Sequence, residues 1–471
     1  MSSFDEKYTD SIPLENPGTR TIHLTENVIK EHSYRPSADY SSSSNFQNIL
    51  SGKYLIRNQI WDFPSSSDAL KIGKLLGKGG YGEVYEIYHL TMPEKKFALK
   101  IPGPPLSITK GYILNEIQKL KTLNKPGNYH IPRIKYGFFS IFKERIPYYI
   151  THIFTPVEKL FPNFSNNLPI DPLTTLEIFY MMASGLKYIT SHHIVHNDIK
   201  PENFMFLYGL PVITDYGTAR SYSEINEVEL ERLEGRLHGT PVWLPPELIS
   251  IEKEDKQEEI YFNLSKVGQK TDVWGLALVL MRYLIGQSLF HDVPLTYKIP
   301  DIFYITHQQF YEAKIVQRYR QHVSRRLYRL YEPHYTMREN IKKIFIPRLK
   351  NMLFENESYV EEKMRNYIHP SGEADVGQEN STSLSKILIN QILNKKIKLK
   401  QRQHSDFEIQ EFFLQSFLDF YDMCLAPLQD RIKIYTLVDI LEIIFPGMAY
   451  NNQKIVQNTI LEPLISTENN D

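Results

Sequence analysis

Residues 194–206 read IVHNDIKPENFMF, and this stretch decides the fold. An apolar run leads into three polar side chains within six residues, Asp198, Lys200 and Asn203. A carboxylate can orient a hydroxyl group and accept its proton, a cation can offset phosphoryl charge, and an amide oxygen can bind Mg²⁺. Taken singly, each side chain is ordinary loop polarity. In this order and spacing they predict a loop that transfers a phosphoryl group to a hydroxyl.

A second polar turn, TDYG, follows the apolar run LPVI and places Asp215 twelve residues after Asn203. A carboxylate at the end of a short apolar strand supplies a further oxygen ligand for a metal ion. We therefore predict that Asn203 and Asp215 bind Mg²⁺, with Mn²⁺ as the alternative ion.

A glycine-rich stretch, GKGGYGEV, occupies residues 77–84. Glycines let a turn lie close over phosphate groups and present backbone N–H groups to them. Alone, such a stretch is more often only a turn. Here it lies between two alternating segments, whereas a dinucleotide-binding turn would need a helix directly after it. The residues expected to contact a nucleotide are Gly77, Lys78, Gly79, Gly80, Gly82 and Val84.

Two charged residues, Lys100 and Glu116, follow the glycine-rich stretch at intervals of sixteen residues. Lys100 ends the apolar FALK sixteen residues after Val84, and Glu116 comes sixteen residues later in a helical pattern. Separately they are typical of a solvated strand end and a helix surface. If the helix packs on the sheet, Glu116 can pair with Lys100 and hold the ammonium against the α- and β-phosphates of a nucleotide.

Together these stretches resemble the signature series of the protein kinase superfamily. The resemblance covers roughly residues 70–290 and 405–447. It implies an α+β, bilobal fold, with a small antiparallel β-rich N-terminal lobe that holds one key helix and a large α-helical C-terminal lobe. The matching residues are Gly77, Gly79, Gly82, Val84, Ala98, Lys100, Glu116, His196, Asn197, Asp198, Asn203, Asp215, Tyr216, Gly217, Glu247, Asp272, Trp274 and Arg431.

The resemblance implies a kinase that uses ATP and Mg²⁺ to phosphorylate a protein substrate. Lys200 and Thr240 are the residues by which the chain resembles serine/threonine rather than tyrosine kinases. A pseudokinase scaffold and a small-molecule kinase of the same fold core are the alternatives. The intact catalytic groups argue against the first, and the DIKPEN and GTPVWLPPE segments against the second. The residues that the resemblance places around the adenine, with Thr151 as gatekeeper, are Val84, Ala98, Thr151 and Met205.

The sequence departs from the family pattern at three positions. Asn197 stands where many members carry an arginine that binds a phosphate on the activation segment, and an asparagine cannot clamp a phosphate bidentately. The chemical groups are intact, so we predict an active enzyme that does not depend on phosphorylation of that segment. Tyr216 replaces a phenylalanine, and Trp243 replaces a tyrosine, which predicts an altered shape beside the phosphoacceptor.

The chain is also longer than the family pattern, because roughly 120 residues separate Phe290 from the next matching helix near Ile409. Residues 303–350 hold eleven Lys and Arg against three Glu, a local excess of +8. This insertion is either a set of solvated basic helices that extend the lobe or a docking surface for an acidic protein, nucleic acid or anionic lipid. The arginines expected to face such a partner are Arg318, Arg325 and Arg329.

These patterns predict a division of the chain into six parts. They are a mostly disordered extension (1–65), the N-lobe (66–155), the first part of the C-lobe (156–290), a basic, mostly helical insertion (291–408), the last C-lobe helices (409–447) and a tail (448–471).

Composition limits the other function classes. The formal net charge is -1, which excludes a bulk polyanion binder. The single cysteine, Cys424, lies in an apolar context and fits a reducing compartment. We expect no signal peptide and no transmembrane segment, hence a cytoplasmic protein. Ile-, Asn-, Lys- and Tyr-rich usage indicates an AT-rich genome, either of a protist or of an intracellular bacterium. A divergent eukaryotic-type kinase with a disordered start and a polar tail resembles bacterial effectors that are secreted into a host cell cytosol.

Overall fold

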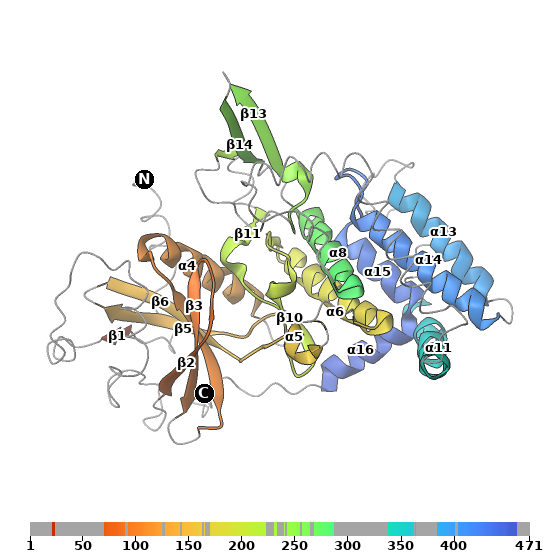
Figure 1. The fold of residues 1–471 in the computed structure, drawn as a ribbon, viewed down its shortest axis with the longest axis horizontal. Helices are drawn as coiled ribbons and strands as arrows, with labels where there is room; N and C mark the ends of the chain where they lie inside the picture. The colour runs from red at the N-terminus through yellow and green to blue at the C-terminus, as the bar shows by residue number, and fades with distance from the viewer. Residues whose placement is uncertain are drawn as a thin grey trace. The chain divides into compact units, whose positions relative to one another are not determined.

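The structure is a computed structural model of the 471-residue chain. The described residues form two compact units, which are considered separately below (Figure 1). The first unit takes the residues up to Thr155 together with Thr214–Ala219, and the second takes Pro156–Ile213 and the residues from Arg220 to Asn458. The structure describes residues 21–23, 70–89, 93–124, 128–141, 144–162, 164, 170–222, 230–232, 240, 243–254, 257–263, 268–286, 338–361, 363, 384–400 and 404–458.

The first unit is built on a six-stranded sheet of order β1-β5-β6-β4-β3-β2. All neighbouring strands run antiparallel except β1, which pairs parallel with β5. The extension 1–65, predicted to be mostly disordered, lies outside the described residues, except for the three residues of β1. The strands are β1 (Thr21–His23), β2 (Leu70–Lys78), β3 (Gly82–His89), β4 (Lys96–Pro102), β5 (Lys135–Ile141) and β6 (Glu144–Thr151).

One helix, α4 (Leu106–Leu123), packs on this sheet. Its apolar positions Ile113, Ile117 and Leu120 recur every three or four residues, so they fall on one face and are almost completely buried. Burial of this face against β4 and β6 also places Glu116, one residue before Ile117, in the interior. The short turn η3 (Tyr216–Thr218) lies against the same helix.

The second unit is mainly helical, and its core is formed by α6, α8, α14 and α15. Asp171 caps α6 by accepting the backbone N–H of Thr174 at 2.8 Å, and Ser405 and Glu408 form a capping box on α14. The helices are α5 (Val157–Leu160), α6 (Pro172–Ser191), α8 (Gln269–Ile285), α11 (Arg338–Phe354), α13 (Leu384–Lys400), α14 (Asp406–Cys424), α15 (Ile434–Ile444) and α16 (Pro446–Asn458).

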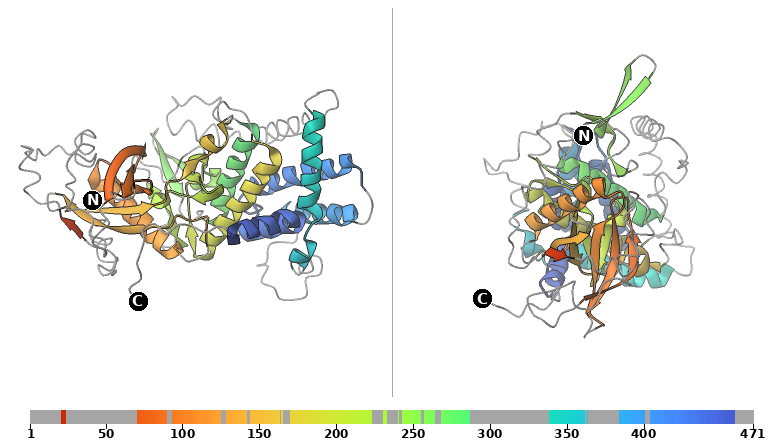
Figure 2. Two further views of the ribbon diagram at one scale, coloured as in Figure 1. Left: turned by 90° about the horizontal axis from the view of Figure 1, so that it is seen from below. Right: turned by 90° about the vertical axis from the view of Figure 1, so that its left-hand side faces the viewer.

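Short elements connect these helices. A small sheet of order β12-β14-β13 pairs the short strand β12 with a hairpin, β13 and β14, that projects from the helices of its unit (Figures 1 and 2). The short elements are β7 (Thr155–Pro156), β8 (Ile194–Val195), η2 (Pro201–Asn203), β9 (Phe204–Leu207), β10 (Leu210–Ile213), β11 (Arg220–Ser221), β12 (Leu230–Arg232), η5 (Pro246–Leu248), β13 (Ile249–Glu254), β14 (Gln257–Asn263) and η7 (Glu357–Val360).

Two helices from the predicted insertion, α11 and α13, belong to the packed interior of the second unit. Helix α11 crosses α14 and α16 (Figure 2), and its Phe345 packs edge-on against Phe413 with ring centroids 6.0 Å apart. At the α16 contact, a Cβ on Gly447 would collide with the backbone oxygen of Asn351, so only glycine permits this close approach. The described part of the insertion therefore extends the core of the lobe.

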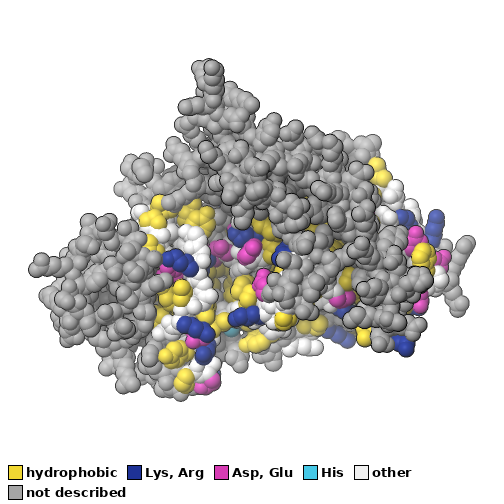
Figure 3. Space-filling model, viewed as in Figure 1, with side chains coloured by type: hydrophobic (Ala, Val, Ile, Leu, Met, Phe, Trp, Pro, Cys, Tyr) yellow, Lys and Arg dark blue, Asp and Glu magenta, His cyan; other side chains and the backbone are white. Residues whose placement is uncertain are grey.

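Several basic residues of this described part are paired with carboxylates of the same unit. Arg348 contacts Glu177 at 2.5 Å and Asp171 at 3.2 Å, and Lys350 lies 2.8 Å from Asp406. On the face shown in Figure 3, dark blue and magenta side chains are interleaved over the described surface. These pairs fit the interpretation of basic helices that extend the lobe. The predicted docking arginines, Arg318, Arg325 and Arg329, lie outside the described residues.

The predicted α+β, bilobal class is confirmed. Helix α16 continues beyond the predicted start of the tail at 448, because Met448 and Ala449 are buried. The rest of the six-part division stays a prediction. Among the residues that the structure describes, no helix is both long and apolar enough to cross a membrane.

Candidate active site

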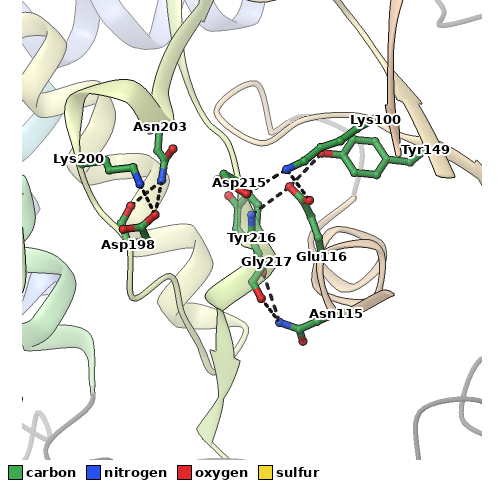
Figure 4. A network of polar contacts seen from close by, with 10 residues as sticks. All are labelled: Lys100, Asn115, Glu116, Tyr149, Asp198, Lys200, Asn203, Asp215, Tyr216 and Gly217. Carbon is green, nitrogen blue, oxygen red and sulfur yellow. Dashed lines mark hydrogen bonds and ion pairs between the residues drawn. The ribbon is translucent and has the colours of Figure 1, made fainter. Parts of the chain in front are cut away.

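In the first unit two carboxylates lie beside Lys100, which is on β4 (Figure 4). Its Nζ lies 2.7 Å from Oε2 of Glu116 and 2.9 Å from Oδ1 of Asp215. Burial alone would lower the pKa of an ammonium group, but the carboxylates of Asp215 and Glu116 raise the pKa of Lys100 well above its ordinary value. The lysine is therefore held as a cation.

Helix α4 and strand β6 together orient Glu116. Its Oε1 accepts the hydroxyl of Tyr149 at 2.9 Å and the backbone N–H of Tyr216 at 3.1 Å, while its Oε2 faces Lys100. Tyr149 is the cross-strand partner of Lys100, so its ring lies beside the ion pair. Sequence reasoning missed Tyr149. The available signal was strand alternation, which places residue 149 on the same face as Thr151.

A second contact between α4 and the turn was also missed. The amide nitrogen of Asn115 lies 3.0 Å from the carbonyl oxygen of Gly217, 2.9 Å from that of Ala219 and 3.4 Å from that of Tyr216 (Figure 4). Asn115 directly precedes Glu116, so the two side chains hold the backbone of the same turn. Asp215 opens this turn with a left-handed backbone, at φ 67°.

The glycine-rich stretch forms the turn between β2 and β3. The N–H of Gly79 donates to the carbonyl of Gly82 at 2.9 Å, which closes the turn. The side chain of Lys78 pairs with the fully buried Glu83 at 3.0 Å. Gly77 pairs with Val84 across the hairpin, and an added Cβ at Gly77 or at Gly80 would meet nothing within 4 Å.

The tip of this turn contacts α4 through an aromatic pair. The rings of Tyr81 and Tyr112 are stacked, with centroids 3.8 Å apart and planes 21° from parallel. Tyr112 lies three residues before Asn115 and four before Glu116, so these three side chains share one face of the helix. One helix face therefore contacts the glycine-rich turn, the lysine and the turn that follows Asp215.

The residues predicted to surround the adenine lie on different elements. Ala98 on β4 and Thr151 on β6, the predicted gatekeeper, are cross-strand partners. The hydroxyl of Thr151 donates to the carbonyl of Arg133 at 2.7 Å. Val84 faces Lys100 across β3 and β4, whereas Met205 lies on β9 of the second unit. Their role in adenine binding stays a prediction.

The second unit holds the other predicted cluster, which is centred on Asp198. Oδ2 of Asp198 accepts Nζ of Lys200 at 2.7 Å, and Oδ1 accepts the hydroxyl of Thr240 at 2.9 Å. Lys200 also donates to Oγ1 of Thr240 at 2.8 Å, which closes a triangle of three side chains. Asn203 donates to the backbone oxygen of Asp198 at 2.8 Å and to its Oδ2 at 3.0 Å (Figure 4).

Helix α8 holds the backbone of the loop that contains Asp198 through hydrogen bonds to Asp272. Asp272 accepts the backbone N–H groups of His196 and Asn197 at 2.8 and 2.9 Å. Burial nevertheless raises the pKa of Asp272 to about 7, against those two hydrogen bonds. Gly275 lies one helical turn further on, and a Cβ there would come within 3 Å of Ile199, so glycine allows α8 to approach the loop closely.

Asn197 takes a left-handed backbone conformation, with φ 65°, which asparagine adopts more readily than most residues. Its side chain is buried, and among the described residues neither polar atom of its amide has a hydrogen-bond partner. The substitution for arginine therefore leaves an uncharged, buried side chain at this position.

Arg431 and Glu247, two of the residues that carry the family resemblance, form an ion pair. Arg431 is buried, and its guanidinium contacts both carboxylate oxygens of Glu247, at 2.5 and 3.1 Å. It also lies over the ring of Trp274, 4.8 Å from the centroid, and donates to the carbonyls of Ala426 and Lys270. A buried guanidinium is tolerated because its donors are satisfied.

The protein kinase domain model matches residues 70–349, which is more than half of the 471 residues. The chain belongs to the protein kinase family. The match confirms the resemblance to eukaryotic-type kinases and reaches further than residue 290, so it includes most of α11. The expectation of a bacterial effector stays a prediction.

Three similar proteins illustrate this membership. The kinase is 28% identical over 230 residues to an Aurora kinase of Debaryomyces hansenii, which covers 48% of this chain and 50% of the relative. It is 28% identical over 232 residues to the serine/threonine-protein kinase stk11 homolog of Dictyostelium discoideum (46% and 35%). It is 26% identical over 259 residues to the human mitogen-activated protein kinase kinase kinase 19 (50% and 17%). The chain thus spans half the length of the first relative and less of the other two.

Proposed function

We propose that this kinase transfers the γ-phosphate of ATP to serine or threonine hydroxyls of a protein substrate. The observation that carries the proposal is the triangle of Asp198, Lys200 and Thr240. Asp198 orients the substrate hydroxyl and accepts its proton, and Lys200 stabilises the charge of the transferring phosphoryl group. Thr240 fixes both side chains through its hydroxyl.

The charged cluster of the first unit fits a nucleotide and its metal. Lys100 offers an ammonium group to the α- and β-phosphates, and Glu116 keeps that group in place. Asp215 of this cluster offers a carboxylate, and Asn203 of the second unit offers an amide oxygen; hard oxygen ligands suit Mg²⁺ or Mn²⁺. Bound metal neutralises phosphate charge during transfer.

We further propose that activity does not require phosphorylation of the activation segment. Asn197 is uncharged and buried, so it cannot bind a phosphate as an arginine does. Part of the segment is instead paired in a sheet, because Leu230–Arg232 runs antiparallel to residues of β14. Dephosphorylated protein is expected to keep most of its rate. A loss of more than about tenfold on phosphatase treatment, about 1.4 kcal/mol in barrier, would contradict this.

The decisive experiment measures transfer of labelled phosphate from ATP to serine, threonine and tyrosine peptides, with and without Mg²⁺. Lys100→Met and Asp198→Asn should each lower the rate by several powers of ten, because each removes transition-state electrostatics. Lys96→Met is the matched control, since Lys96 lies on the same strand and pairs with Glu86 at the surface. Near-full rates in both site variants, or transfer to tyrosine alone, would refute the proposal.

A further inference from the structure

Asn115 makes contacts that the ion pair of Lys100 and Glu116 does not explain. It lies on α4, and its side-chain nitrogen points at carbonyl oxygens of the turn that begins with Asp215. An amide nitrogen carries two hydrogens, so the two shorter contacts, to Gly217 and Ala219, are the principal hydrogen bonds.

The turn presents these carbonyls because of its backbone shape. Asp215 is left-handed, and the single 3₁₀ turn Tyr216–Thr218 follows it, closed by the N–H of Ala219 donating to Tyr216 at 3.1 Å. So short a turn leaves most of its carbonyl groups to find partners elsewhere. Asn115 supplies the donors for two of them.

Glu116 contacts a backbone N–H group of the same turn, whereas Asn115 contacts backbone carbonyl groups. Its carboxylate accepts the N–H of Tyr216, whereas Asn115 donates to the carbonyls that follow. One donor and one acceptor on adjacent helix residues fix both the position and the direction of the turn's backbone. Helix α4 and the turn should therefore move together.

We propose that Asn115 is a positioning residue that holds the Asp215 carboxylate in the orientation for metal binding. This inference rests on the proposed function, since it assigns Asp215 to Mg²⁺. Asn115 touches neither nucleotide nor metal. Its effect is to keep the backbone of the turn from rotating, so that Asp215 need not be ordered when the ion binds.

The test uses Asn115→Asp, which keeps the size and shape of the side chain but replaces the donor by a carboxylate that repels the carbonyls. Gly111→Ala is the matched control on the same helix, because an added Cβ there meets nothing within 4 Å. Hydrogen exchange of the full-length protein, measured by mass spectrometry without nucleotide, reports on the amides of residues 214–219. Asn115→Asp should exchange there at least tenfold faster than wild type, and Gly111→Ala should match wild type.

Kinetics provide the second measurement. Asn115→Asp should raise the Mg²⁺ concentration for half-maximal phosphotransfer about tenfold, while the KM for ATP at saturating Mg²⁺ changes less than threefold. The conservative variant Asn115→Gln, which keeps the donor, should recover part of the Mg²⁺ affinity. Unchanged exchange at 214–219 in Asn115→Asp would overturn the inference, and so would equal effects on Mg²⁺ and ATP. If wild type transfers no phosphate, the proposed function fails, and the exchange measurement still decides whether Asn115 holds the turn.

Discussion

Lys396 carries a buried amino group, and replacing it should change how the stability of the protein depends on pH. It lies on α13 with 1% of its side chain exposed, and its ammonium donates to the carbonyl of Leu353 near the end of α11. The ring of Phe354 lies 4.6 Å from the nitrogen, and Glu357 lies 3.8 Å away. Lys400, which pairs with Glu357 at 2.6 Å, is the other charge nearby.

Burial lowers the pKa of Lys396 to about 7, and Glu357 offsets this only in part. In the unfolded chain a lysine titrates near 10.4, so between these values the unfolded state binds more protons. The free energy of unfolding therefore rises with pH across this window and falls as the pH drops toward 7. From pH 7 to pH 9 the expected gain is about 2 kcal/mol, from the linkage of proton binding to folding.

The experiment compares urea unfolding at several values between pH 7 and pH 9 for wild type, Lys396→Met and Lys395→Met. Methionine keeps the apolar stem without the charge, so Lys396→Met should lose the rise of about 2 kcal/mol. Lys395 is exposed and adjacent, so its variant should keep it. If the free energy of unfolding changes with pH in the same way for wild type and Lys396→Met, the argument that burial lowers the pKa of Lys396 is refuted.

Three further predictions follow from buried contacts. Burial raises the pKa of the Cys424 thiol to about 12, so iodoacetamide at pH 8 should label it only after unfolding; rapid labelling of native protein would contradict this. Gly447→Ala should lower the free energy of unfolding by about 1–3 kcal/mol, because a Cβ would meet the backbone of α11, and an unchanged urea midpoint would argue against that packing. Tyr149→Phe removes a hydrogen bond to the Glu116 carboxylate, worth about 1.5–3 kcal/mol, and should slow phosphotransfer roughly tenfold or more. The control Tyr148→Phe should keep the wild-type rate. A wild-type rate in Tyr149→Phe would show that the hydrogen bond is dispensable.

The pairing of Lys100 with Glu116 could be predicted from the sequence, because both residue types stand at a defined place in a strand and in a helix. Lys100 and Glu116 are sixteen residues apart, yet their pairing follows once a helix with apolar period 3.6 packs on a strand. The contacts of Asn115 and Tyr149 escaped prediction, because they depend on which backbone groups the turn exposes and on strand register. Strand alternation places Tyr149 on the same face as Thr151, but the register that sets Tyr149 opposite Lys100 cannot be read from the sequence pattern.

For the insertion at 291–408, the sequence could not predict how its basic residues are used. Its net positive charge was visible in the sequence, but charge alone does not tell a docking surface from a self-neutralised one. Arg348 pairs with the carboxylates of Asp171 and Glu177. Both of these residues lie more than 170 positions earlier in the chain. Only the three-dimensional structure brings them together.

The ion pair between Glu247 and Arg431 has a consequence for synthesis of the protein. The two residues are 184 positions apart, so at ~5–20 residues per second the ribosome needs roughly 10–40 s to add the second after the first. During that interval the nascent chain holds the Glu247 carboxylate and the Trp274 ring without the guanidinium that later contacts both. A polypeptide that terminates anywhere before residue 431 stays in this incomplete state and is a natural client for chaperones and proteases.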